Sequence, residues 1–237
     1  MAEKRLVEII SLSYRIAHAH NLHFWSFLAI TGAVMLAIQY FGWIAYAVGY
    51  PAAVLLRLDP TVDAITVGVQ ILRVLHRIFG ILWGALIITY GVYLVAFRKL
   101  EVLRPLTKPL REQIAEAKAL TGRYLFGKPI PKEVEEKLDR HNVFVAYTVL
   151  ILIIGIAMSA ISGAAMIFLP LSLEQYRQML LWHDLGFYLS LIFVYLHLFA
   201  ALHPANAPIL RAMFRDGMLS LEEAKKHMPK WLQRKGL

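Results

Sequence analysis

The sequence contains no cysteine among its 237 residues. This absence excludes disulfide bonds and every cysteine-ligated cofactor, including iron–sulfur clusters, thiolate-bound haem and covalently attached c-type haem. A redox centre bound by this chain must therefore depend on histidine or methionine, or belong to a partner protein. Nine histidines and eight methionines are present.

Charged residues are also scarce, at 17% of the chain, whereas hydrophobic residues make up 59%. The apolar residues gather in four blocks, at about 16–40, 74–97, 142–168 and 180–203, each long enough to cross a hydrocarbon layer about 30 Å thick. No small-residue cleavage site follows the first block, so no cleaved signal peptide is expected. We expect an all-α integral membrane protein, a four-transmembrane-helix bundle forming one membrane domain over residues 1–237.

Basic residues are nearly absent from two connections. Segments 41–73 and 169–179 carry only Arg57, Arg73 and Arg177, whereas the N-terminus, the loop 98–141 and the tail 204–237 are rich in lysine and arginine. Because excess basic residues stay cytoplasmic, both termini and the loop 98–141 are predicted to lie inside. This placement accounts for the net charge of +9. We expect a multi-pass protein of the cytoplasmic membrane in contact with lipid, and no nucleic-acid partner.

Three short elements are predicted outside the spans. The first outer connection is expected to carry an interfacial helix near 51–58. Prolines bound a short helix from Leu110 to Leu120 in the middle loop. In the tail, Ser220 and Glu223 form a capping-box pattern that opens a surface helix.

His183 and His197 stand fourteen residues apart in the fourth apolar block. On an α-helix this spacing gives about 21 Å of rise and returns to nearly the same face, about 40° short of four turns. Ionisable groups inside a membrane helix are costly and mark ion paths, proton relays or cofactor ligands. Two imidazoles on one stripe, separated by most of a membrane, indicate one axial ligand for each of two stacked haems.

The predicted membrane topology indicates which histidines could be the second axial ligands of these two haems. The first and third helices run outward, and the second and fourth run inward, so His183 and His76 begin their helices at the outer edge. His197 lies near the inner edge, and so do His18, His20 and His23. We therefore predict two b haems, an outer one held by His76 and His183 and an inner one held by His197 and a residue of this trio.

Within the trio the register favours His18, which lies fourteen residues before Gly32, the spacing that also separates the two histidines of the fourth block. Gly32 would then lie beneath the outer porphyrin, where a missing side chain permits close approach. His23 and His20 remain alternatives. Single membrane histidines are more often interhelical hydrogen-bonding residues, and the edge and tail histidines are interpreted as non-ligands: His141, His203 and His227.

Three arginines lie at the matching edges, where they could pair with haem propionates: Arg15, Arg73 and Arg77. Ordinary anchoring at the membrane interface explains them equally well.

The chain resembles the dihaem cytochrome b gamma subunit of membrane-bound formate dehydrogenases over most of its length. The resemblance rests on matching residues in or beside three of the apolar blocks and in the tail. These are residues 15–18 and 31–32, residues 73–76 and 79–80, His183, His197, residues 211–214, Gly217, and the tail run 224–231. It implies His18, His76, His183 and His197 as haem ligands. It also implies an iron–sulfur subunit and a molybdopterin or tungstopterin catalytic subunit as partners. Related cytochromes b anchor hydrogenases and sulfur-compound reductases.

The resemblance also implies a menaquinone site beside the inner haem, in a segment that opens the third span. Asn142 matches this segment, and His141 is a weaker second contact, but Phe144 and Val145 stand where glycine and glutamine are expected. This departure weakens the prediction of the quinone type. The alternative role of Asn142 is to cap the helix.

Two other classes of function remain. A self-contained quinone oxidoreductase with a small diffusible donor, such as superoxide, would need a cationic funnel on the outer side. The three basic residues of the outer connections argue against such steering. A transporter or structural anchor would carry no haem at all.

Overall fold

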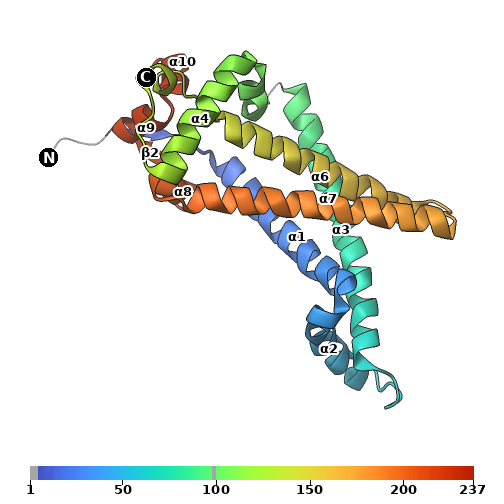
Figure 1. The fold of residues 1–237 in the computed structure, drawn as a ribbon. Helices are drawn as coiled ribbons and strands as arrows, with labels where there is room; N and C mark the ends of the chain where they lie inside the picture. The colour runs from blue at the N-terminus through green and yellow to red at the C-terminus, as the bar shows by residue number, and fades with distance from the viewer. Residues whose placement is uncertain (1–4, 98–99) are drawn as a thin grey trace. The chain divides into compact units, whose positions relative to one another are not determined.

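The computed structural model describes residues 5–97 and 100–237, so Lys4, Arg98 and Lys99 of the predicted cytoplasmic regions lie outside the described residues. Figure 1 shows the helices that make up most of the fold. In chain order the elements are β1 (Leu6–Glu8), α1 (Leu12–Leu36), α2 (Ile38–Leu55), α3 (Ala64–Ala96), η1 (Glu101–Thr107), α4 (Leu110–Phe126), α5 (Lys132–Glu135), α6 (Val143–Phe168), α7 (Leu173–Leu202), η2 (Pro204–Asn206), α8 (Ala207–Phe214), β2 (Met218–Ser220), α9 (Leu221–His227) and α10 (Pro229–Arg234).

Three helices in the described part of the chain are long and apolar enough to cross a membrane on their own: α3, α6 and α7. Helices α1 and α2 qualify together, although they are bent by 116° at a short break. The four blocks of the sequence thus correspond to α1, α3, α6 and α7. The fold also contains two short strands, which were not predicted from the sequence.

Helices α3 and α7 begin earlier than the apolar blocks, at Ala64 and Leu173. His76 and His183 therefore stand well inside their helices, and the prediction that each begins a helix is wrong. The physical reason is capping. The Asp63 carboxylate accepts the N–H of Thr66 at 3.0 Å. Ser172 and Gln175 exchange hydrogen bonds in a capping box that opens α7. The apolar blocks mark the predicted membrane crossings, whereas these caps mark the helix ends.

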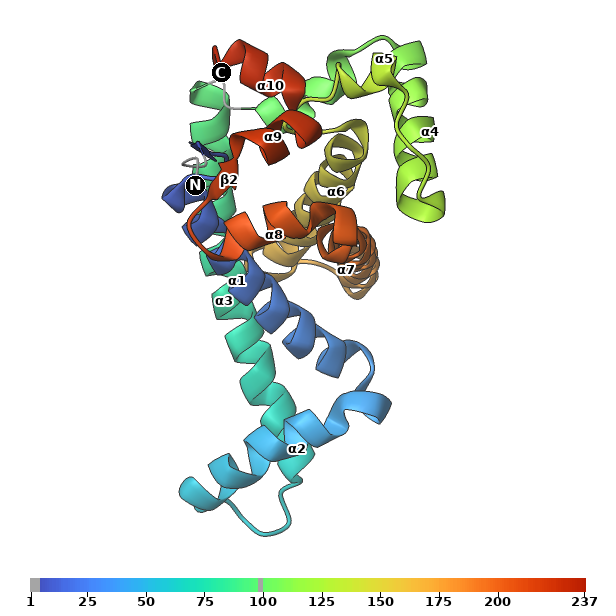
Figure 2. The ribbon, with the colours of Figure 1, turned by 90° about the vertical axis from the view of Figure 1, so that its left-hand side faces the viewer.

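Helix α1 ends at Leu36, four residues before the end of the predicted span, because Ala37 leaves the helical region with φ −141° and ψ 60°. The following helix, α2, occupies 38–55 rather than 51–58. Figure 2 shows α2 lying across the N-terminal end of α3. A Cβ atom built on Gly49 or Gly68 would overlap backbone atoms of the other helix. The two backbones thus touch, and the bend after α1 makes this packing possible.

The chain divides into two compact units. The second consists of 17–92 and 160–181, and it contains most of α1, all of α2 and most of α3. Its buried cluster joins Val34, Ala45 and Leu72.

The first unit consists of 1–16, 93–159 and 182–237. Strand β1 pairs antiparallel with β2, with Val7 opposite Leu219. Around this pair the two ends of the chain bury a small apolar core that includes Trp231 and Leu232. The predicted cap of α9 is confirmed, because the Glu223 N–H donates to the Ser220 hydroxyl at 3.2 Å.

Helix α4 extends to Phe126, six residues beyond the predicted end. One Glu116 carboxylate oxygen accepts the Val143 N–H of α6 at 2.9 Å. Near the other end of α4, the Tyr124 carbonyl contacts His203 Nε2 at 3.2 Å, just after α7. Helix α4 therefore joins the beginning of α6 to the end of α7, as Figure 1 shows.

Candidate haem-ligand and quinone sites

His76 on α3 is held by α1 through a hydrogen bond. Its Nδ1 atom lies 2.8 Å from the Thr31 hydroxyl, and Thr31 is almost fully buried. With its single hydrogen directed to the Phe27 carbonyl at 2.9 Å, this hydroxyl accepts from His76 Nδ1–H in that arrangement. A Cβ atom built on Gly32 would lie 3.4 Å from the His76 ring. Gly32 thus faces the ligand candidate itself.

His183 on α7 is held in a similar way by α6. Its Nδ1 atom lies 2.8 Å from the Ser159 carbonyl oxygen, and the Ser159 hydroxyl donates to the His183 carbonyl at 3.2 Å. Because a carbonyl oxygen can only accept, Nδ1 carries the proton in this arrangement.

The α6–α7 contact around His183 is close. A Cβ atom on Gly186 would lie 2.6 Å from the Gly155 carbonyl oxygen and 2.7 Å from Ser159 N. A Cβ atom on Gly155 would lie 2.8 Å from the Gly186 carbonyl oxygen. Small residues on both helices let the backbones approach, which is the usual basis of tight packing in membranes.

These contacts test whether the residues fit a haem. When Nδ1 donates a hydrogen bond, the lone pair of the neutral imidazole lies on Nε2, the atom that can bind iron. Partners of this kind fix the ring orientation and raise the basicity of metal-ligating histidines. His76 and His183 both fit the axial-ligand role. The sequence motif included Thr31 but gave it no role, and Ser159 was missed because its contact is made by the backbone.

The inner histidines have different surroundings. The His197 ring stacks on Phe193, with ring centroids 5.4 Å apart, and the residue is exposed. His18 is half-buried. His23 contacts the Ala19 carbonyl through Nδ1 at 2.7 Å and is exposed, as is His20. His18 and His76 belong to one compact unit and His183 and His197 to the other, so the pairing of ligands across the units stays a prediction.

Of the three arginines, Arg15 has the most distinctive contacts. One guanidinium nitrogen donates to the Arg215 carbonyl, whereas its Nε atom is buried and has no partner among the described residues. A buried N–H of this kind fits a propionate acceptor. Arg73 contacts Gln70 at 3.4 Å and is exposed, as is Arg77, which fits interface anchoring as well.

Asn142 caps α6. Its side-chain oxygen accepts the Val145 N–H at 3.0 Å, and its side-chain NH₂ donates to no protein acceptor within the described residues. Burial, assisted by the Arg140 cation, lowers the pKa of the neighbouring His141 to about 4, against the opposing effect of Glu101 and Asp139. His141 is therefore neutral at pH 7 and offers one N–H donor. Capping leaves the Asn142 amide group able to donate to a quinone carbonyl.

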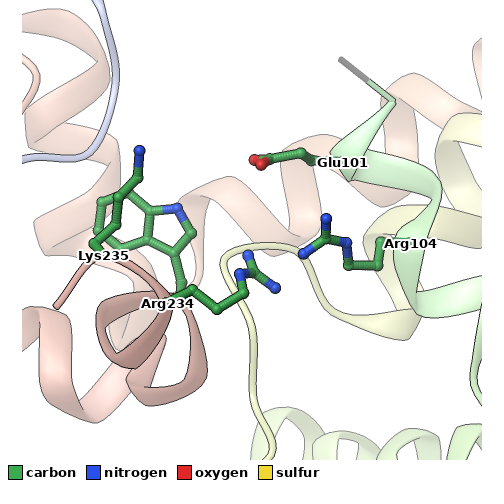
Figure 3. A pocket seen from close by; sticks show the side chains of 5 residues that line it. Glu101, Arg104, Arg234 and Lys235 are labelled. Carbon is green, nitrogen blue, oxygen red and sulfur yellow. The ribbon is translucent and has the colours of Figure 1, made fainter. Parts of the chain in front are cut away.

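The segment before α6 is fixed by the C-terminal tail. Arg234 forms a two-pronged ion pair with Asp139, one branch at 2.9 Å. The Lys230 N–H donates to the Leu138 carbonyl at 3.1 Å. Arg140 lies 6.0 Å from the Trp231 ring. Next to these contacts is a hollow of about 250 Å³, into which Arg104 and Arg234 extend toward each other in Figure 3.

A family model described as prokaryotic cytochrome b561 matches residues 9–216. The chain belongs to the prokaryotic cytochrome b561 family. A search of curated proteins gives no match. As a prokaryotic cytochrome b561, the protein is a multi-pass membrane protein with a four-helix fold and binds haem b. It is a membrane electron-transfer subunit that anchors an oxidoreductase complex. The four-helix membrane fold, the haem and the electron-transfer role predicted from the sequence are thus confirmed.

The match ends at residue 216, before the tail run 224–231 that contributes to the resemblance to formate dehydrogenase. The family match therefore identifies the type of membrane subunit and not its catalytic partner.

Proposed function

We propose that this cytochrome b561 carries two b haems and passes electrons from a peripheral iron–sulfur subunit on the outer face to a menaquinone-type quinone near Asn142. Two haems, when bound, supply one-electron redox centres between the two faces. The observation that supports this best is that His76 and His183 each donate Nδ1–H to a neighbouring helix. That pattern orients a ring for iron.

The residues of the chain have separate parts in this proposal. His76 and His183 hold the outer haem, and His18 and His197 hold the inner one. Arg15 binds an inner propionate. At the inner edge, the Asn142 amide donates to one quinone carbonyl. Proton uptake there, with electrons arriving from outside, stores about 2.3 kcal/mol per charge moved against 100 mV.

The catalytic partner proposed is a molybdopterin or tungstopterin formate dehydrogenase, because the tail run 224–231 resembles the gamma subunits of such complexes. A hydrogenase or a sulfur-compound reductase is the alternative. Purification of the native complex tests this point directly: a large molybdenum or tungsten subunit supports the proposal, and a nickel subunit contradicts it.

The number of haems is tested by a pyridine haemochrome assay on the purified protein. We expect about two b haems per chain. A ratio near one contradicts the dihaem proposal, and a colourless protein favours a transporter or a structural anchor.

The quinone site is tested by Asn142→Asp, which keeps an oxygen for the helix cap but removes the amide donor. We expect both haem spectra to be unchanged and reoxidation by a menaquinone analogue to slow by about tenfold, the effect of one lost hydrogen bond. Gln233→Glu, which makes the same amide-to-acid change at an exposed position of α10, serves as the matched control. Reoxidation at the parental rate in Asn142→Asp removes this residue from the site.

A further inference from the structure

An open groove of about 450 Å³ runs along one side of α4, and neither the haem ligands nor the quinone candidates line it. Its lining includes Ile114, Ala117 and Thr121, which follow one another three and four residues apart and so share a stripe, with Gly122 beside them. Phe126, the last residue of α4, also lines the groove. Two lysines, Lys118 and Lys128, line the same groove.

The local sequence builds this groove through the end of α4. Gly127 adopts a left-handed φ of 64°, which a residue with a side chain rarely adopts, and the Lys128 N–H donates back to the Gly122 carbonyl at 3.1 Å. The chain therefore folds back over its own helix. The Lys128 stem passes over Gly122, and its amine lies 5.6 Å from the centre of the Phe126 ring.

The buried side of α4 shows where the helix lies relative to the membrane. Buried Glu116 is paired with Lys108 at 2.5 Å and binds the first turn of α6, while Gln113 accepts the Tyr147 hydroxyl at 2.8 Å. With Tyr124 contacting His203 after α7, α4 is fastened where α6 begins and α7 ends. This end of both spans is the side that the charge distribution assigns to the cytoplasm.

The free side of α4 combines apolar and basic groups. Ile114 is 46% exposed and Phe126 is 68% exposed, and both stand beside the two exposed lysines of the groove. Apolar groups that flank cations on a helix at the membrane edge match the structure of a lipid, whose acyl chain and anionic headgroup adjoin. The cytoplasmic leaflet supplies the negative charge that complements these lysines.

We propose that the α4 groove binds an anionic glycerophospholipid of the inner leaflet. Lys118 and Lys128 bind the headgroup phosphate, and Ile114 and Phe126 pack against the first part of an acyl chain. This site is separate from the proposed electron-transfer path. Evidence against lipid binding would therefore leave the proposed function unaffected.

The test measures lipid binding to the purified, delipidated protein by native mass spectrometry, with phosphatidylglycerol and phosphatidylcholine as probes. The parent protein is expected to prefer phosphatidylglycerol. The double variant Lys118→Gln/Lys128→Gln is expected to bind it about thirtyfold more weakly, because each lysine near a lipid surface contributes about one kilocalorie per mole. The matched control, Lys225→Gln/Lys226→Gln, removes the same charge from exposed positions of α9 and is expected to keep the parental affinity.

Three outcomes would overturn the proposal: equal phosphatidylglycerol affinity in the two double variants, equal affinity of the parent for both lipids, or a change of oligomeric mass in the groove variant without a change in lipid binding. The last would identify a second copy of the chain as the occupant. An unchanged haem spectrum shows that the groove variant is folded. If it does not fold, the parent alone decides the question, since its affinity for phosphatidylglycerol must fall with rising salt.

Discussion

The two helix pairs that present the outer ligand candidates solve the same problem with different groups. In the pair α1–α3, a buried threonine side chain accepts His76 Nδ1–H. In the pair α6–α7, a backbone carbonyl, that of Ser159, accepts His183 Nδ1–H. The glycine contacts differ as well, because Gly32 leaves ordinary van der Waals space beside His76, whereas Gly155 and Gly186 leave none.

This difference shows which ligand depends on which part of the sequence. His76 depends on one hydroxyl group, which a single substitution can remove. His183 depends on the separation of two backbones, which side-chain changes at Ser159 affect little and changes at the glycines affect strongly. We therefore expect loss of a hydroxyl group to matter most in the pair α1–α3, and an added methyl group between the helices to matter most in the pair α6–α7.

Among substitutions at the contacts between these helices, the largest effect is expected for Gly186→Ala. The added methyl group would lie too close to the Gly155 carbonyl and to Ser159 N. The helices must separate, at a cost of about 3 kcal/mol, and the hydrogen bond to His183 lengthens. We expect a lower midpoint of thermal unfolding and loss of haem in detergent. Gly84→Ala is the control, because a Cβ atom there meets nothing within 4 Å, and parental stability in Gly186→Ala would contradict the close packing.

The next effect is expected for Thr31→Val, which keeps the volume of the side chain and removes its hydroxyl. His76 Nδ1–H then lacks its acceptor, so the affinity for the outer haem should fall by about ten- to a hundredfold. The measurement is a haem titration of the apoprotein, accompanied by a redox titration. Thr31→Ser, which restores the hydroxyl, should recover most of the affinity; a serine variant as weak as the valine variant would assign the effect to packing.

The smallest effect is expected for Ser159→Ala. This change removes the hydroxyl that donates to the His183 carbonyl at 3.2 Å but keeps the carbonyl that accepts from Nδ1. Interhelical hydrogen bonds of this kind contribute about 0.6 kcal/mol on average. Haem content and spectra should therefore remain parental. A loss comparable to that of Thr31→Val would remove the distinction between the two helix pairs.

Hydropathy and charge placement predicted the spans from the sequence, because burying apolar groups in lipid dominates the folding of these segments. The helix ends were predicted less well. The cap at Asp63 and the capping box formed by Ser172 and Gln175 can be recognised in the sequence. The helix starts were nevertheless placed at the beginnings of the apolar blocks, which lie further along the chain. The bend at Ala37 has no local signal such as proline or glycine, and the Gly49–Gly68 contact that it makes possible joins residues of two different helices.

The candidate site was also predicted only in part. Histidine spacing predicted His76 and His183, because the period of a helix relates position to face. The groups that hold their rings were harder to find, since a hydroxyl such as that of Thr31 has many uses and a backbone carbonyl has no sequence signature. The cap at Asn142 was foreseen as an alternative role, and the structure shows that the same side chain also keeps an amide donor.

The proposed binding of one haem by both His76 and His183 is tested most directly by comparing the variants His76→Ala and His183→Ala by low-temperature optical spectroscopy with redox titration. In the proposed pairing, each variant would remove one of the two ligands of the outer haem. Both variants are expected to lose the same spectral component and the same midpoint potential, while the other component persists. Loss of different components from the two variants would contradict this pairing.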